Sequence, residues 1–141
     1  MKLTKEQYLA RMEQTYDIEG YKERGKAQRE LLREYHYGME IGDKGSVKLW
    51  SDVNPCTVIK RTKTTVTIRY DKATRSPDWK PEWIPGGFSA ICTNSEEQQW
   101  TIEDDPNGTV ETFYWSSREN CFVHHGSRLT PGWRKYYDYN F

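Results

Sequence analysis

The sequence lacks long hydrophobic runs and any sign of a cleavable leader. None of its segments approaches the roughly 18 apolar residues that a membrane-spanning helix needs. The opening residues, Met1-Lys2-Leu3-Thr4-Lys5-Glu6, carry charge where a secretory signal would place its apolar core. We therefore expect a protein that does not associate with membranes and stays in the cytoplasm where it is made.

Cysteine is scarce, with only Cys56, Cys92 and Cys121 and no CxxC pair. An odd number without a secreted context predicts reduced thiols. Cys121 and His124 have CxxH spacing, His125 follows, and the other two cysteines would complete a Cys3His zinc site if the fold brought them together. In a strand, however, residues i and i+3 point to opposite faces. Buried thiols and no metal are the favoured interpretation, and a metal on Cys121 and His124 stays open.

Recognisable catalytic motifs are also missing. The chain has no Walker loop, dinucleotide-binding glycine fingerprint, nucleophile elbow or HExxH helix. We expect no enzyme and no cofactor. A small enzyme of unrecognised type is the least favoured alternative, and it would require two of His124, His125, Asp138 and Cys121 to converge in a cleft.

Net charge is absent too, since 21 Lys and Arg balance 21 Asp and Glu, which excludes a strongly basic protein that coats nucleic acid. The distribution is uneven: residues 44–80 hold nine bases and three acids, whereas residues 81–111 hold seven acids and no base. Separated faces of opposite sign would favour protein–protein steering or head-to-tail self-association. If the fold interleaved the two segments, their opposite charges would cancel. The sequence leaves both alternatives open.

Helical signals are confined to residues 1–40, which we expect to form an arm. Thr4-Lys5-Glu6-Gln7 is a capping box. Apolar residues then recur at helical spacing, with interruptions at Gly20 and Gly25, so we expect helices near 5–16 and 20–37 that end at Gly38. The apolar stripe is narrow. The arm is therefore expected to pack on the body by one face, with dimerisation or a partner as the alternative.

From residue 41 to 141 the pattern changes to short alternating segments, which predicts one aromatic-rich β domain. The expected strands are Gly45–Trp50, Cys56–Arg61 after an Asn54-Pro55 turn, Thr64–Tyr70, Trp100–Glu103, Thr109–Trp115, Cys121–His124 and Trp133–Tyr139. Trp100–Glu103 and Thr109–Trp115 should pair as a hairpin through Asn107-Gly108, with positive φ at the turn. Residues 71–95 should form a long structured loop. The fold class is thus α+β, with a helical arm of one or two helices before a small, strongly bent antiparallel barrel or sandwich of SH3-like or OB-like size.

What the sequence has in abundance is aromatic side chains, including six Trp and ten Tyr, and several lie beside Arg and Lys. Rings stack on bases while cations neutralise phosphate, a combination suited to a nucleotide or single-stranded nucleic acid. The more ordinary alternative is that such rings form the core. The candidate ligand-binding residues are Trp50, Arg69, Trp79, Trp83, Arg118 and Arg134.

The β domain also contains a distinctive set of short words. They are Gly42-Asp43-Lys44, Leu49-Trp50-Ser51-Asp52, Cys56-Thr57-Val58-Ile59-Lys60, Pro81-Glu82-Trp83-Ile84, Gly86-Gly87-Phe88, Cys92-Thr93-Asn94, Asp105-Pro106-Asn107-Gly108-Thr109, Trp115-Ser116 and Tyr137-Asp138-Tyr139-Asn140-Phe141. Over about residues 42–141 the chain resembles a group of small proteins of tailed bacteriophages and prophages.

The resemblance implies provenance: a phage accessory protein in the cytoplasm of an infected bacterium that acts by binding, in an anti-defence or host-directed role. Our leading hypothesis is stoichiometric binding of a nucleotide or nucleic acid by the six residues above. The alternative is an inhibitor directed at a host or defence protein through Glu96–Asp105 or the arm, and a homo-oligomer is possible in either case.

Overall fold

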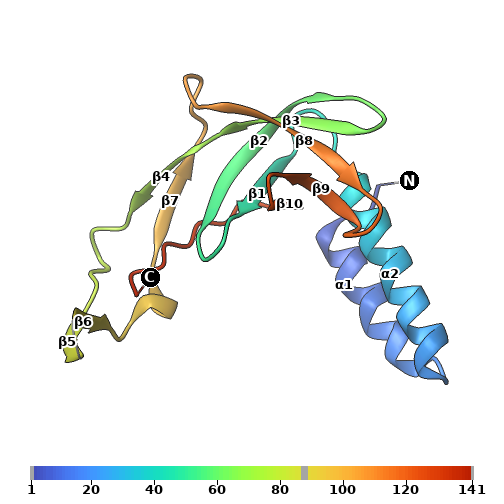
Figure 1. Cartoon of the computed structure of the whole chain (residues 1–141), viewed down its shortest axis with the longest axis horizontal. Helices are drawn as coiled ribbons and strands as arrows, with labels where there is room; N and C mark the ends of the chain where they lie inside the picture. The colour runs from blue at the N-terminus through green and yellow to red at the C-terminus, as the bar shows by residue number, and fades with distance from the viewer. Residues whose placement is uncertain (1, 87–88, 141) are drawn as a thin grey trace.

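The computed structural model describes residues 2–86 and 89–140 and shows a small β-barrel with a leg on each side. The first leg is the N-terminal helical arm. The second is an extension built from strands inserted between two neighbouring barrel strands. Both legs descend from the barrel, so the molecule has the outline of an arch (Figure 1). The expected α+β class with a helical arm before a small antiparallel β domain is confirmed, and of the two alternatives, barrel and sandwich, the structure has a closed barrel.

The arm is a helical hairpin of α1 (Lys5–Gln14), a 3-10 turn η1 (Thr15–Asp17) and α2 (Tyr21–Tyr37). The capping box forms as predicted, because the Thr4 hydroxyl accepts from Gln7 N at 3.1 Å and Gln7 Oε1 accepts from Thr4 N at 3.1 Å. Gly20 breaks the helix with φ 85° and caps α2, whereas Gly25 lies inside α2. Neither α-helix in the arm is long and apolar enough to cross a membrane.

Apolar residues within the two helices stay partly or fully exposed, and the most buried residues of this region flank them. Tyr8 stacks on Tyr35 with ring centroids 4.2 Å apart, which joins the helices. Leu3 and Met39 are 4% and 2% exposed. The arm therefore attaches to the body through its ends, and its outer turns project from it (Figure 1).

Six strands form the barrel, β1 (Lys44–Lys48), β2 (Val53–Arg61), β3 (Thr65–Tyr70), β8 (Val110–Ser116), β9 (Cys121–His124) and β10 (Ser127–Pro131). Each pairs antiparallel with its neighbour in this order, and β1 also pairs with β10, which closes the ring. The inward-facing side chains of the alternating strands fill the interior. The buried cluster is Met39, Val47, Cys56, Val58, Val66, Ile68, Phe113, Phe122 and Leu129.

The barrel has one sealed end and one open end. At the sealed end, Met39 enters the core, and a Cβ on Gly45 would meet its Cε at 2.8 Å. Arg61 Nε donates to Met39 O at 2.9 Å and Nη2 donates to Tyr37 O at 2.7 Å, which fixes the end of α2. The other end is called the mouth below. It contains the β1–β2 turn, the β9–β10 turn, and the end of β3 and start of β8, where the chain continues into the extension.

The extension corrects two sequence predictions. Residues 71–95 are not one loop, because they include β4 (Lys72–Arg75), β5 (Trp83–Gly86) and β6 (Ser89–Cys92), with η2 (Ser95–Glu97) beginning at their end. The predicted hairpin of residues 100–103 and 109–115 is also wrong: β7 (Trp100–Glu103) pairs with β4, while β8 pairs with β3 and β9. The reason is that β4–β7 continues the β3–β8 ribbon outward, and both strands bend where they leave the barrel.

Gly108 lies at this bend and not in a tight hairpin turn. In the described ranges positive φ is found at Gly20, Gly42, Asn120, His125, Gly126 and Gly132, so the positive φ expected at Asn107-Gly108 is wrong for both residues. The Gly108 backbone instead approaches the preceding ribbon closely, and a Cβ on Gly108 would overlap the Tyr70 carbonyl oxygen. Tyr70 N donates to Thr109 O at 2.9 Å beside it.

Two more strand boundaries differ from the prediction. Asn54 and Pro55 lie inside β2 and not in a turn before it. The last expected strand, 133–139, is a tail with a single bridge from Val53 to Tyr136, and residues 127–131, between the last two expected strands, form β10. The tail instead packs on the extension: Tyr137 N donates to Gln98 Oε1 at 2.8 Å, and Asn140 Nδ2 donates to Cys92 O at 3.0 Å.

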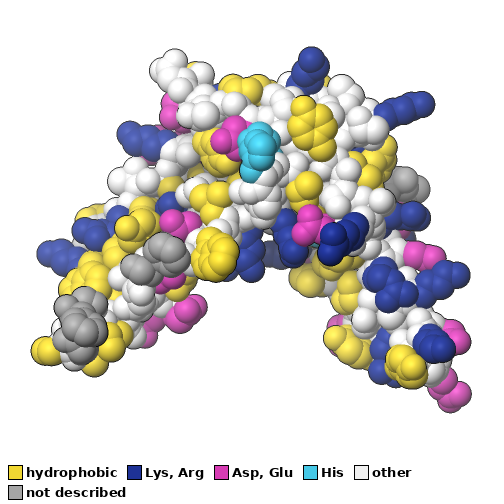
Figure 2. Space-filling view, in the orientation of Figure 1, with side chains coloured by type: hydrophobic (Ala, Val, Ile, Leu, Met, Phe, Trp, Pro, Cys, Tyr) yellow, Lys and Arg dark blue, Asp and Glu magenta, His cyan; other side chains and the backbone are white. Residues whose placement is uncertain are grey.

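The basic and acidic segments interleave where the barrel meets the extension. Lys72 on β4 lies opposite Glu103 on β7, and Lys44 forms a 2.6 Å ion pair with Asp104. On the face shown in Figure 2, Lys and Arg side chains are interspersed with Asp and Glu over both legs. Of the two alternatives for the charge distribution, the structure favours mixing at this junction.

Candidate functional site

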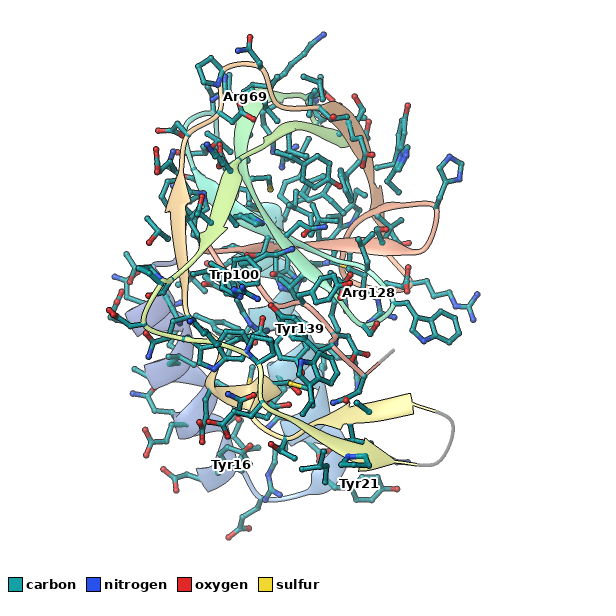
Figure 3. The ribbon with its side chains drawn as sticks, turned by 90° about the vertical axis from the view of Figure 1, so that its left-hand side faces the viewer. Tyr16, Tyr21, Arg69, Trp100, Arg128 and Tyr139 are labelled. Carbon is teal, nitrogen blue, oxygen red and sulfur yellow. The ribbon has the colours of Figure 1, made fainter. Side chains whose placement is uncertain are left out.

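The structure disperses the six candidate ligand-binding residues over the molecule. Trp50 projects from the β1–β2 turn with 91% of its surface exposed, and Arg118 lies in the β8–β9 turn at the opposite, sealed end. Arg69 is on β3, and Figure 3 shows it far from Trp100 and Tyr139 of the extension and tail. Arg134 is exposed in the tail.

Only Trp79 and Trp83 come together, and they do so on Tyr139. The ring centroids of Trp79 and Tyr139 are 5.4 Å apart, and those of Trp83 and Tyr139 are 6.2 Å apart. Trp79 is 6% exposed, so its ring belongs to the packing between the tail and the extension, while Trp83 is 48% exposed. The six residues therefore do not line one shared cavity among those seen in the described structure.

The mouth of the barrel is a cleft of about 640 Å³, within the range of small-ligand sites, which often lie at barrel mouths. Its walls come from the β1–β2 turn, β2, β3, β4, β8, the β9–β10 hairpin and the tail. Its lining residues are Leu49, Asn54, Pro55, Tyr70, Asp71, Ala73, Thr109, Glu111, His124, His125, Ser127 and Lys135. The fold thus brings polar residues that are distant in sequence together around one cleft.

Two histidines form one side of the mouth. The β9–β10 turn is a two-residue connection in which His125 has φ 46° and Gly126 has φ 85°, a geometry typical of a tight hairpin turn. It sets the rings of His124 and His125 nearly perpendicular, with centroids 4.4 Å apart. Cys121 lies at the other end of β9, where it pairs with Ser116 and is buried, so the CxxH residues do not converge.

The three cysteines are buried as expected, and burial raises the pKa of the Cys56 thiol to about 12. Across residues 2–86 and 89–140, no three His, Cys, Asp or Glu side chains gather in a way that could hold a metal ion.

Tyr70 and Glu111 form the floor of the mouth. The Tyr70 hydroxyl donates to Glu111 Oε2 at 2.9 Å. Burial raises the pKa of Tyr70, and the hydrogen bond to Glu111 raises it further, because both disfavour the phenolate. Glu111 keeps acceptor capacity for a ligand, since a carboxylate accepts more than one hydrogen bond.

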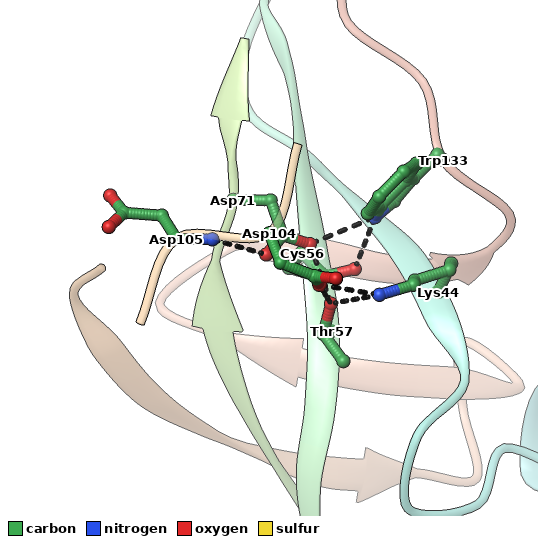
Figure 4. A network of polar contacts seen from close by, with 7 residues as sticks. All are labelled: Lys44, Cys56, Thr57, Asp71, Asp104, Asp105 and Trp133. Atoms are coloured by element: carbon green, nitrogen blue, oxygen red, sulfur yellow. Dashed lines mark hydrogen bonds and ion pairs between the residues drawn. The ribbon is translucent and has the colours of Figure 1, made fainter. Parts of the chain in front are cut away.

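A network behind the mouth fixes the bend between barrel and extension (Figure 4). Asp71 accepts from Thr57 Oγ1 at 2.6 Å and from Trp133 Nε1 at 2.9 Å. Asp104 pairs with Lys44, and this hydrogen bond lowers the pKa of the Asp104 carboxyl. Asp71 thus anchors one wall and the tail, and its negative charge is engaged by groups of the protein itself.

Lys135 is the only Lys or Arg that lines the mouth in the described structure. Its Nζ donates to Asn54 Oδ1 at 2.7 Å and lies 5.3 Å from the centre of the Trp100 ring. Burial lowers the pKa of Lys135, and the charge of Asp52 partly opposes this. The ammonium is therefore held in place by an amide and an aromatic face, without an ion pair among the described residues.

Sequence reasoning missed the mouth although it noticed several of its residues. The sequence pattern identifies His124 and His125 only as candidate metal ligands, and Tyr70 only as the end of an expected strand. A signal that would have helped is His125-Gly126 between two β segments, which predicts a tight turn that presents its side chains at a barrel end.

Comparison with protein-family models, with curated proteins and with solved structures finds no match to this chain. A function for this chain is therefore inferred from its own sequence and geometry.

Proposed function

We propose that this protein is a phage-encoded accessory binding protein that holds a small nucleotide-like ligand in the barrel mouth and acts stoichiometrically in the bacterial cytoplasm. The observation that supports the proposal is the convergence of Lys135, His124, His125 and Glu111 on one cleft of suitable volume. The resemblance of residues 42–141 to phage proteins supports the provenance.

The wall chemistry suits a ligand with both an anionic group and hydrogen-bonding edges. The Lys135 ammonium and the histidine N–H groups can donate to phosphate oxygens. Glu111 and Asn54 are acceptors for the amino and imino groups of a base.

The charge of the mouth limits the size of the anion. Lys135 contributes one positive charge, against the negative charges of Asp71 and Glu111. Such a site suits a nucleoside or a single phosphate better than a polyphosphate or a long strand, whose binding depends on many cationic contacts. We therefore place nucleoside monophosphates and cyclic nucleotides ahead of single-stranded nucleic acid.

Calorimetric titration with mono-, cyclic and oligonucleotides tests the proposal. Lys135→Met keeps most of the side-chain stem, and His125→Asn suits the left-handed backbone of that turn. Each is expected to weaken binding about tenfold, since a charge-assisted hydrogen bond contributes about 1.5 kcal/mol. Arg134→Gln is the control, because Arg134 is exposed and lies outside the cleft lining. Absence of heat with every nucleotide, or equal weakening by Arg134→Gln, would contradict the mouth as the site.

A protein-directed inhibitor is the second candidate, and the exposed apolar side chains of the arm favour it. Tyr16 and Tyr21 are 66% and 79% exposed at its outer end, with Leu9 also exposed (Figure 3). Aromatic residues are enriched in protein interfaces. A stoichiometric partner captured from host lysate by the wild type and lost with a Tyr16→Ser, Tyr21→Ser double variant would support it. Self-association of the purified chain that the same variant abolishes would identify the arm as an oligomer interface instead.

A further inference from the structure

A second concave surface, called the arm groove, lies at the sealed end of the barrel, away from the mouth. It has a volume of about 590 Å³ and is lined by Glu30, Arg33, Glu34, Tyr37 and Trp115. The last turns of α2 form one side, and the end of β8 forms the other. Because α2 packs on β9 and β10, the position of this groove is set by the attachment of the arm.

Two aromatic rings form fixed walls of the arm groove. Tyr37 and Trp115 have centroids 5.1 Å apart and an interplanar angle of 85°. The Tyr37 hydroxyl donates to Lys63 O at 2.6 Å, and Trp115 packs edge-on against buried Phe122 with centroids 5.0 Å apart. Both rings are anchored by groups outside the groove, so they need no rearrangement to meet a ligand.

Two glutamates of α2, Glu30 and Glu34, line the same groove. Glu30 and Glu34 are separated by four residues, a spacing at which like charges on a helix repel each other. Neither makes an ion pair within residues 2–86 and 89–140, although Arg33 also lines the groove. The helix therefore carries a local repulsion that a bound cation would relieve.

The Tyr37 ring already accommodates a guanidinium from the same chain. Arg61 Cζ lies 4.5 Å from the centre of the Tyr37 ring and 4.8 Å from that of Phe122, and Arg61 does not line the groove. Stacking on aromatic faces with a planar fork toward carboxylates is characteristic of arginine and not of lysine.

We propose that the arm groove binds an arginine side chain of a partner protein, with the guanidinium against Trp115 and its N–H groups toward Glu30 and Glu34. This site is independent of the ligand in the mouth, because the two cavities share no lining residue.

The test uses N-acetyl-arginine N-methylamide as the probe and follows the indole N–H signal of Trp115 by NMR. The citrulline counterpart is the matched control, since it replaces the guanidinium with an uncharged group of nearly the same shape. We expect the arginine probe to shift the Trp115 signal saturably in the millimolar range, and the citrulline probe to bind about tenfold more weakly. Equal binding of the two probes, no saturable shift, or tighter binding of the lysine counterpart would overturn the proposal.

Protein variants test the carboxylates. A Glu30→Gln, Glu34→Gln double variant should weaken the arginine probe about tenfold, and it should remain folded because it removes a repulsion. Glu13→Gln, which changes an exposed glutamate of α1 outside the groove, should leave binding unchanged. Wild-type affinity in the double variant, with helicity retained in its circular dichroism spectrum, would show that the carboxylates do not hold the cation and would contradict the proposal.

Discussion

The two ends of the barrel have the same six strands but different closures. At the sealed end, Met39 completes the core and Arg61 binds the carbonyls that terminate α2. At the mouth, most of the lining side chains are polar, and the Tyr70 hydroxyl donates a hydrogen bond to Glu111. We therefore expect residues at the sealed end to contribute more to stability than residues at the mouth.

The largest expected effect is at the sealed end. Met39→Ala should lower the free energy of unfolding by about 2–5 kcal/mol, because it removes a fully buried side chain and leaves a cavity. Leu49→Ala at the mouth should cost about 1 kcal/mol or less, since Leu49 is 39% exposed. Urea denaturation of both variants measures the difference. Similar losses would mean that the two ends contribute equally to the core.

Arg61→Met should have the next largest effect. It keeps much of the side-chain volume but removes the donors to Met39 O and Tyr37 O, at a cost of about 1.5–3 kcal/mol. Hydrogen exchange should show faster opening in the last turns of α2 than in β3. Uniform acceleration over arm and barrel would instead indicate that the two unfold as one unit.

The pH dependence of stability tests the sealed end, where His36 of α2 bonds to Asn120 of the β8–β9 turn. Burial lowers the pKa of His36, and its hydrogen bond between Nδ1 and Asn120 O at 2.9 Å only partly opposes this. The unfolded chain therefore binds the proton more readily, so stability should fall as pH drops below about 6.5 toward the lower folded pKa. Chemical denaturation at several pH values should show this dependence reduced in His36→Gln. An unchanged slope would assign the effect to other groups.

The smallest expected effect concerns Trp50. Because its side chain is 91% exposed, Trp50→Ser should change the free energy of unfolding by about 0.5 kcal/mol or less. Nucleotide affinity should also stay close to that of the wild type, since Trp50 does not line the mouth. A large loss of nucleotide affinity with unchanged thermal stability would show that Trp50 contacts the ligand after all.

Local signals in the sequence predicted local structure well. The capping box, the break at Gly20 and the end at Gly38 depend on residues a few positions apart, and both helices lie within two residues of their expected bounds. Thr65–Tyr70 and Cys121–His124 followed from their own patterns.

Pairing between distant segments was not predictable in the same way. Residues 104–109 look like a hairpin turn, yet they connect β7 and β8, which do not pair with each other: β7 pairs with β4 and β8 with β3, through residues at least 25 positions earlier in the chain. The prediction of the binding-site residues failed for a related reason. Trp79 and Arg69 were chosen by residue type, whereas the mouth depends on topology that brings Asn54, Glu111 and Lys135 together.

Ring closure has a consequence for the order of folding. The β2–β3 and β9–β10 hairpins join residues close in sequence, but β1 meets β10 through pairs such as Gly45 with Pro131, 86 positions apart. The entropy of closing such a loop must be lost before its contacts stabilise the chain, and folds rich in distant pairings form slowly. Until β10 arrives, β1 presents an unpaired edge next to a hydrophobic interior, a surface prone to aggregation. If the arm attached at Met39 before β10 paired with β1, it would shield that interior, and the N-terminal helices would then have a kinetic role distinct from their contribution to the finished structure.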